Sequence, residues 1–130
     1  MEVIEGLFEK ALKLESPWQV KAIEFKESEK RLKILIDFPR GSVFKCPECG
    51  KEEKGYDTKE KEWRHLNFFQ YECHLVVRVP RIKCKEDGIL QVEVPWARKG
   101  ADFTLLFESF AMTLCREMPV NKVSKIIGED

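Results

Sequence analysis

The start of the chain predicts a helix and then a β-hairpin. Apolar residues recur at helical spacing over residues 3–14, and Ser16-Pro17 ends the pattern, as expected of a short amphipathic helix. Two β-rich runs follow at residues 18–25 and 31–36, with the polar link 26–30 between them. In the second run large apolar side chains alternate with other residues, which is typical of a strand with one buried face. We therefore expect these two runs to pair as a hairpin.

The middle of the chain predicts a loop, a long β-rich stretch and a second hairpin. Residues 51–62 are so rich in charge that we expect a solvated loop, and a β-rich stretch follows over residues 63–79. The run 78–85, RVPRIKCK, has four positive charges and no negative ones. After a turn at residues 86–88, apolar residues alternate again over residues 89–95. These last two runs predict a hairpin that closes at this turn.

Beyond residue 103 the apolar period becomes helical. Apolar residues gather on one face until Pro119, and a last short helix over residues 119–127 closes at Gly128, a residue typical of helix C-termini. Two helices joined by a tight turn are a helix-turn-helix candidate. The order of elements predicts an α+β fold with an N-terminal helix, β-hairpins and a C-terminal helix pair.

Composition narrows the classes of function that the chain can have. Among 130 residues, 23 Lys and Arg balance 23 Asp and Glu, so any surface for a polyanion has to be local. No apolar run approaches the roughly 20 residues that span a bilayer, and the acidic N-terminus is unlike a secretion signal. We expect a cytoplasmic protein without membrane contact, whose five cysteines serve as metal ligands and thiols rather than as disulfides. No arrangement of acid, base and nucleophile predicts an enzyme or a small-molecule substrate.

The stretch FKCPECGKEE holds the most specific chemical signal. Cys46 and Cys49 have the C-x-x-C spacing that places two thiolates on one zinc ion, and Cys84 is the natural third ligand. Zinc sites of this kind have four ligands, and two residues are candidates for the fourth. Asp87 follows Cys84 at the same spacing, whereas His65 would need the charged segment to bring it back beside Cys49. The competing interpretation is a turn that has lost its metal.

Aromatic residues interleave with Arg64 in the β-rich stretch. They are Trp63, Phe68, Phe69 and Tyr71. Such a cluster can stack unpaired bases, but a small β domain needs large apolar side chains, and we expect core packing instead. Cys73 and Cys115 are expected to be buried thiols.

Several motifs in a fixed order resemble one protein family. Along the chain they are C-P-E-C-G, W-R-H-L-N-F-F-Q, V-P-R-I-K-C, V-E-V-P-W-A-R, F-T-L-L-F-E and R-E-M-P-V. Together they resemble the N-terminal region of the ISL-three family of insertion-sequence transposases, over nearly the whole chain from Cys46 onward. The resemblance implies a zinc-binding domain followed by a helix-turn-helix. Combined with the predicted N-terminal helix, it leads us to expect a zinc-ribbon-like β domain at residues 1–98 and a partial helix-turn-helix at residues 99–130.

The same resemblance implies the zinc ligands and the partner. The family's cysteine pair falls on Cys46 and Cys49 and its later cysteine on Cys84, while the position of Asp87 usually holds histidine or cysteine in relatives. The family's recognition helix and catalytic carboxylates lie beyond Asp130. We therefore expect a DNA-binding N-terminal portion of a transposase, which contributes to recognition of the terminal repeats at transposon ends and does not itself cut DNA.

Six cations are the candidates for contacts with DNA phosphates. They are Arg81, Lys83 and Lys85 on one face of the predicted strand 78–85, and Arg116, Lys122 and Lys125 on the helix pair. Cations of this kind position a protein on DNA without reading its sequence; alternatively, the strand lysines only guard an exposed sheet edge. The competing hypothesis for the whole chain is a non-catalytic structural or protein-interaction module, a truncated remnant that forms a homodimer through the apolar face of its terminal helices.

Overall fold

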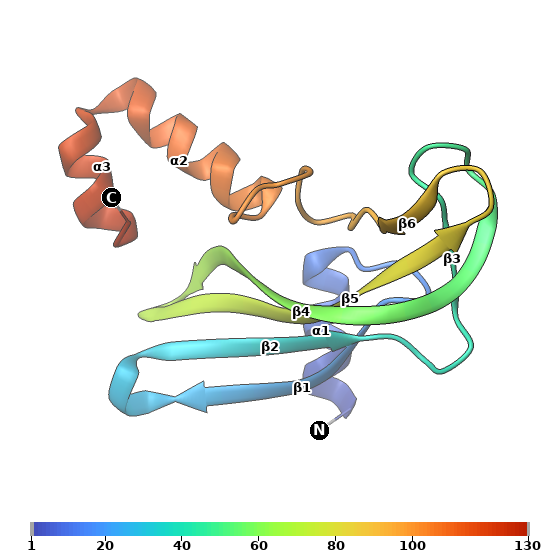
Figure 1. Ribbon diagram of the computed structural model, residues 1–130. Coiled ribbons are helices and arrows are strands. Elements are labelled where there is room, and N and C mark those ends of the chain that lie inside the picture. The colour runs from blue at the N-terminus through green and yellow to red at the C-terminus, as the bar shows by residue number, and fades with distance from the viewer. Residues whose placement is uncertain (1, 130) are drawn as a thin grey trace.

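The computed structural model describes residues 2–129. Three α-helices, six β-strands and one 3-10 turn follow one another along the chain (Figure 1). In order they are α1 (Glu2–Leu12), β1 (Gln19–Lys26), η1 (Glu27–Glu29), β2 (Arg31–Asp37), β3 (Val43–Lys45), β4 (Glu52–Phe68), β5 (Tyr71–Cys84), β6 (Gly88–Gln91), α2 (Leu105–Glu117) and α3 (Val120–Ile127). The α+β class predicted from the sequence is confirmed.

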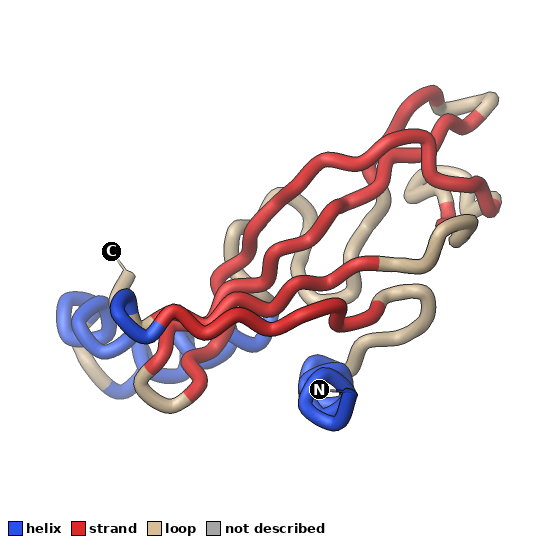
Figure 2. The backbone as a smooth tube through the Cα atoms, turned by 90° about the horizontal axis from the view of Figure 1, so that it is seen from below, coloured by secondary structure: helices blue, strands red, loops and turns tan. Residues whose placement is uncertain are grey.

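One mixed sheet in the order β1-β2-β5-β4-β3 organises the molecule, and β6 adds to the free part of β5. The predicted hairpins are present as the antiparallel pairs β1–β2 and β5–β6. A parallel ladder between β2 and β5, from Arg31–Glu72 to Ile36–Val77, joins the first hairpin to the rest of the sheet. Figure 2 shows these strands lying side by side, with the C-terminal helices at the left end of the view and α1 below the strands. Because this ladder joins distant segments, no local pattern predicts it.

The prediction of a loop at residues 51–62 was wrong, because this segment forms most of β4. Its backbone pairs with β5 from Gly55–Ile82 onward, so the ladder stabilises it although few of its side chains are buried. Charged side chains on a strand that is solvated on both faces resemble a loop in sequence. The β-rich stretch 63–79 is also divided, since Phe69 and Gln70 form the turn between β4 and β5.

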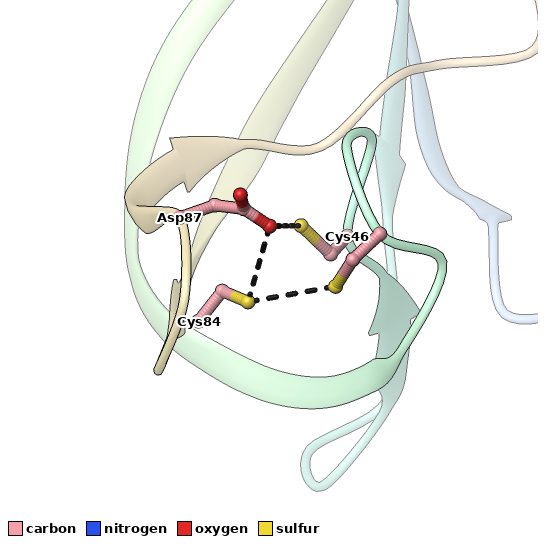
Figure 3. A group of neighbouring side chains, drawn as sticks. Cys46, Cys84 and Asp87 are labelled. Atoms are coloured by element: carbon pink, nitrogen blue, oxygen red, sulfur yellow. Dashed lines mark hydrogen bonds between the residues drawn. The ribbon is translucent and has the colours of Figure 1, made fainter.

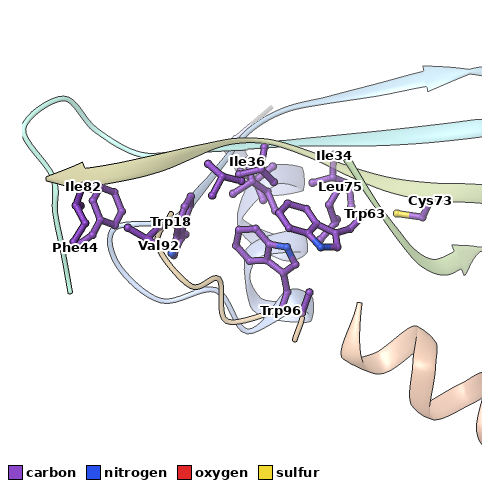
Figure 4. Packing of buried hydrophobic residues seen from close by; sticks show 14 of the residues in the cluster. Trp18, Ile34, Ile36, Phe44, Trp63, Cys73, Leu75, Ile82, Val92 and Trp96 are labelled. Atoms are coloured by element: carbon purple, nitrogen blue, oxygen red, sulfur yellow. The ribbon is translucent and has the colours of Figure 1, made fainter. Parts of the chain in front are cut away.

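The core lies where loops from both ends of the chain cover the sheet. Trp18 packs edge-on against Trp96, with ring centroids 5.1 Å apart, and Trp96 in turn meets Trp63 at 5.5 Å. Phe44, next to the first cysteine turn, packs on Trp18 at 5.7 Å (Figure 4). The predicted strand 89–95 ends early, at Gln91, because the chain leaves the sheet to bury Val92 and Trp96.

The helix pair lies at the end of the molecule opposite the cysteine turns (Figure 1). Thr104 caps α2 by accepting a hydrogen bond of 3.2 Å from the Phe107 backbone N–H, as a helix N-cap should. Gly128 ends α3 with a φ of 76°, a left-handed conformation that glycine adopts without steric cost. Phe107 and Val123 are the buried residues of the two helices, so only a narrow stripe of each helix contacts the rest of the protein.

Candidate metal centre and nucleic-acid interface

Two tight turns present the candidate metal ligands. The first joins β3 to β4: the Cys46 N–H donates to the Lys51 carbonyl oxygen at 2.8 Å, and the Gly50 N–H donates to the Cys46 carbonyl oxygen at 2.9 Å. Gly50 has a φ of 78°, which permits the chain to reverse there. The second turn joins β5 to β6, where Cys84 pairs with Gly88 and Gly88 has a φ of 81°. Each turn therefore supplies ligands from the end of a strand pair.

The four predicted ligands converge, with one ligand atom from each residue lying within 4.8 Å of the others. The Asp87 Oδ2 atom lies 3.4 Å from both the Cys46 and the Cys84 sulfur, and the Cys49 and Cys84 sulfurs are 3.6 Å apart (Figure 3). A tetrahedral zinc ion with bonds of about 2.3 Å to sulfur and about 2.0 Å to oxygen has edges of roughly 3.5–3.8 Å. The three separations of 3.4, 3.4 and 3.6 Å are close to the edges of such a tetrahedron.

The electrostatics of this cluster also fit a cation. The Lys51 backbone N–H lowers the pKa of Cys49, but desolvation and the neighbouring Cys84, Cys46 and Asp87 groups outweigh it and raise the pKa to about 11. Sulfur and carboxylate groups held this close together disfavour their own anionic forms unless a positive ion lies between them. Cys46 and Cys84 are buried, whereas Cys49 and Asp87 are exposed, which leaves one side of the site open to solvent.

His65, the other candidate for the fourth ligand, lies far from the three cysteines of the metal site. It pairs with Cys73 across the β4–β5 ladder, and Cys73 precedes Cys84 on the same strand by a distance of roughly 35 Å at 3.3 Å per residue. Its Nδ1 atom instead forms a hydrogen bond of 2.8 Å with the Thr104 hydroxyl. Desolvation, and secondarily the charge of Arg64, lower the pKa of His65 to about 4. His65 is therefore a neutral structural residue.

Comparison with known proteins agrees with this geometry. Residues 42–87 match the model described as the zinc-finger of transposase IS204/IS1001/IS1096/IS1165, and residues 92–130 match the helix-turn-helix domain of transposase family ISL3. The chain is an N-terminal region of the ISL3 transposase family. Zinc is the metal that this ribbon binds, and the cysteine–carboxylate cluster is its candidate site.

Two curated relatives of this ISL3 region come from Mycobacterium tuberculosis. Both are the transposase for insertion sequence element IS1557, from strains CDC 1551 and H37Rv, and each is 31% identical over 108 residues. The match covers 78% of this chain but 24% of each relative, so the chain spans about a quarter of their length. No solved structure matches the chain significantly. Within residues 2–129, no helix is long and apolar enough to span a bilayer.

Carboxylates neutralise part of the basic run on β5. The Arg78 guanidinium binds both oxygens of Asp37 at 3.0 and 3.1 Å, and Arg81 binds Asp57 through its Nε atom at 2.7 Å and through Nη2. This pairing raises the pKa of Arg81 and lowers that of Asp57. The predicted set on this strand thus includes one paired cation, Arg81, and two exposed lysines, which are Lys83 and Lys85.

Burial along β5 changes phase at Val79 and Pro80, which are both buried. Before this point Arg78 is the outward residue, and after it Arg81 and Lys83 point outward. The Lys83 ammonium lies over the Tyr56 ring at 6.0 Å from its centroid. The predicted grouping of Arg81 with Lys83, apart from Arg78, is therefore found on the outer part of the strand.

The helix pair of this ISL3 region presents its three predicted cations to solvent. Arg116, Lys122 and Lys125 are all exposed. Two of the nearby carboxylates are engaged elsewhere: Glu108 binds Arg98 at 2.8 Å and Glu129 lies 3.5 Å from Arg64. The outward charge of the helix pair is therefore more positive than its composition indicates.

Arg64 is the residue whose importance sequence analysis missed. Its side chain is 3% exposed, it lies over the Phe107 ring at 5.0 Å, and its Nη2 atom donates to the Ile127 carbonyl oxygen at 2.6 Å and to Asn67 Oδ1 at 2.8 Å. Its backbone also exchanges hydrogen bonds with the segment that leads into α2, through Thr104 N–H. Arg64 thus holds both helices onto β4. The one indication of this role in the sequence was the position of an arginine among aromatic residues.

The predicted burial of aromatic residues and thiols holds for some positions and not for others. Trp63 is 2% exposed and belongs to the core, as expected, but Phe69 is 81% exposed. Cys73 is buried, as predicted, and burial raises its pKa to about 12. The prediction for Cys115 was wrong, because it lies on the solvent face of α2.

Proposed function

We propose that this chain is the DNA-end-recognition part of a transposase, which binds the terminal repeats of its element and does not cut them. The observation that carries the proposal is the ISL3 helix-turn-helix match on a helix pair whose exposed cations outnumber its available carboxylates. Among residues 2–129, the single cluster of three or more potential metal ligands is the cysteine site. That site has the character of a structural ribbon, so binding rather than strand cleavage is the activity we assign. In this proposal the chain works in the cytoplasm, where its DNA lies.

Zinc has a structural role in the proposal. We assign Cys46, Cys49, Cys84 and Asp87 as the four ligands; the proximity of their ligand atoms, all within 4.8 Å of one another, supports this assignment. The ion would join the β3–β4 turn to the β5–β6 turn, which an ion pair of 3.1 Å between Lys51 and Glu86 also links. We propose residues 1–98 as the ribbon part and residues 99–130 as the helix-turn-helix part of the DNA-binding unit.

The cations are assigned by their accessibility. We propose that Lys83, Lys85, Arg116, Lys122 and Lys125 contact phosphates directly, and that Arg81 does so only when its pairing with Asp57 is given up. Each phosphate contact releases counterions, so the logarithm of the affinity should fall with the logarithm of the salt concentration by about 0.9 for each contact. With a net charge of zero, the affinity should be weak, with a Kd of roughly 10⁻⁶ M or above at physiological salt.

Fluorescence anisotropy tests this proposal. Labelled duplexes from the DNA that flanks the gene, which would include the element's terminal repeats, are compared with scrambled duplexes at about 50 and about 200 mM salt. We expect binding that prefers the repeats and a salt slope that decreases by about 2 in the double variant Lys122→Ala, Lys125→Ala. Equal binding to both DNAs would contradict end recognition, and no binding to either would contradict the DNA-binding function itself.

A second candidate function is a protein-interaction module that self-associates. The observation in its favour is a set of exposed apolar side chains on α2, namely Leu105, Leu106, Phe110 and Met112. Exposed apolar surface of this kind marks many interaction sites. Sedimentation velocity over a range of concentrations distinguishes the two, because this alternative requires a homodimer and the DNA proposal does not.

A further inference from the structure

The turn of the β4–β5 hairpin carries an aromatic ring in an unusual position. Phe68 pairs with Tyr71, and Phe69 and Gln70 form the turn between them; we call residues 68–71 the hairpin tip. Phe69 has a φ of 54° and is 81% exposed, the highest exposure among the large apolar residues described. Two-residue hairpin turns favour glycine or asparagine at positive φ, and a bulky residue there is an outlier. Folding alone gives no reason to place phenylalanine at this position.

Other aromatic rings pack against Phe69 on its protein side. Its ring meets Phe68 edge-on, with centroids 4.8 Å apart at 78°. Phe68 packs against Phe8 of α1 at 5.5 Å and against Phe25 of β1 at 6.3 Å. The exposed Phe69 ring therefore packs on other aromatic side chains, which limits its motion before any ligand binds. Beside it, the exposed side chain of Gln70 offers a hydrogen-bond donor and an acceptor.

Both neighbours of the hairpin tip carry cations. On one side, Arg64 joins Asn67 and Glu72 to the C-terminal end of α3, so the tip adjoins the helix that bears Lys122 and Lys125. On the other side, the Glu72 N–H donates to the Lys30 carbonyl oxygen at 2.9 Å, which places the β1–β2 turn against the start of β5 (Figure 1).

The β1–β2 turn adds three more cations to this end of the molecule. Lys26, Lys30 and Arg31 are exposed, and within residues 2–129 none of them has a carboxylate within ion-pair distance. Two acids, Glu27 and Glu29, lie in the same turn, so this side is mixed in charge. On the α3 side the acids Glu72 and Glu129 lie within ion-pair distance of Arg64, while Lys122 and Lys125 are exposed.

We propose that Phe69 is a base-stacking site, on which an unpaired nucleobase of DNA stacks while cations of α3 hold the adjacent phosphates. The inference rests on the proposed DNA-binding function and adds a specific contact to it. A single supported ring on a narrow turn between charged elements suits the flat face of one base, since base–aromatic stacking needs only a π-face and tolerates any base. The broader apolar surface that a protein partner would need lies elsewhere, on α2.

The test compares two DNA probes and three proteins. The probes are a fully paired duplex and the same duplex with one bulged 2-aminopurine, whose fluorescence reports stacking. The proteins are the full chain, Phe69→Gly and the control Tyr56→Ala, which removes another exposed ring, 55% exposed, from β4. Phe69→Gly removes the ring and also suits the positive φ, so its melting temperature should stay the same or rise.

We expect the unchanged chain to bind the bulged probe about tenfold more tightly than the paired one and to change the 2-aminopurine signal. Phe69→Gly should lose both effects but keep its affinity for paired DNA, whereas Tyr56→Ala should keep both. Equal affinity for the two probes, or an equal loss in both variants, would overturn the stacking site while leaving DNA binding intact. If Phe69→Gly abolishes self-association and leaves DNA binding unchanged, the tip is a protein contact. If no DNA binds, the proposed function fails together with this site.

Discussion

The Arg64 guanidinium donates a hydrogen bond of 2.6 Å to the carbonyl oxygen of Ile127, at the last turn of α3. Helix C-termini leave carbonyl groups without intrahelical partners, and a buried cation satisfies one of them while also complementing the helix dipole. The same side chain stacks on Phe107 of α2. One arginine of the sheet therefore sets how the two helices of the DNA-binding unit sit on the ribbon.

Replacing this arginine should release the helix pair. We expect Arg64→Ala to lower the free energy of unfolding by about 2–4 kcal/mol, because it removes a buried, hydrogen-bonded charge and its packing on an aromatic ring. Limited proteolysis should cut within residues 98–104 much faster in the variant. The matched control is Arg31→Ala, an exposed arginine of the same sheet. Equal protection of the two variants would show that the helices are held by apolar packing alone.

The fold should lose stability in mild acid because of His65. Burial, with the nearby Arg64 charge, holds the pKa of this imidazole at about 4, against about 6.5 in the unfolded chain. Below that unfolded value the unfolded state takes up a proton that the folded state refuses. The stabilisation is therefore complete above about pH 6.5 and is lost as the pH falls towards 4, by up to about 1.4 kcal/mol per pH unit.

Urea unfolding at about pH 7.5 and about pH 5 measures this effect, with His65→Gln as the comparison. Glutamine keeps a polar contact to Thr104 but has no proton to gain, so its unfolding midpoint should depend less on pH. Zinc release in acid affects both proteins alike, and the difference between them isolates the histidine. Parallel pH profiles for the two proteins would contradict this assignment.

The fourth zinc ligand can be identified by elemental analysis. We expect one zinc per chain in protein purified without chelator, and the same zinc content in His65→Ala. In Asp87→Ala, which loses a direct ligand, the affinity for zinc should fall by more than about 10-fold. Asp87→Cys should bind zinc more tightly than the unchanged chain, because a fourth thiolate completes the commonest ribbon site. Unchanged zinc affinity in Asp87→Ala would mean that solvent already occupies the fourth position.

Asp57 should act as a restraint on DNA binding through Arg81. Asp57→Asn removes the carboxylate that holds this guanidinium, so the affinity for DNA and the steepness of its salt dependence should both rise, the latter by about 0.9 for one new phosphate contact. Asp37→Asn is the matched control, since it breaks the ion pair of Arg78, which is the outward residue of β5 before Val79. If both variants gain equally, the effect is one of net charge and Arg81 makes no particular contact.

Several features of the fold could be predicted because they depend on neighbouring residues. The β1–β2 and β5–β6 hairpins, the helix pair and its glycine cap at Gly128 all follow from local periodicity and turn chemistry. The cysteine turns at Cys46 and Cys84 were also visible, since the C-x-x-C spacing is a property of the turn itself. The position of Asp87 beside the three cysteines, and of His65 far from them, was open until β4 and β5 formed.

By itself the sequence determined most of the helices and hairpins, the metal chemistry and the family, because these depend on spacing along the chain. Only the tertiary structure decided what depends on contacts between distant segments. Residues 52–62 became a strand because β5 offered a backbone ladder that their charged side chains do not reveal. Arg64 became buried because α2 and α3 supplied an aromatic face and a carbonyl oxygen for it. Phe69 remained exposed because the hairpin turned there, and pattern alone does not separate a ring in the core from a ring at a tip.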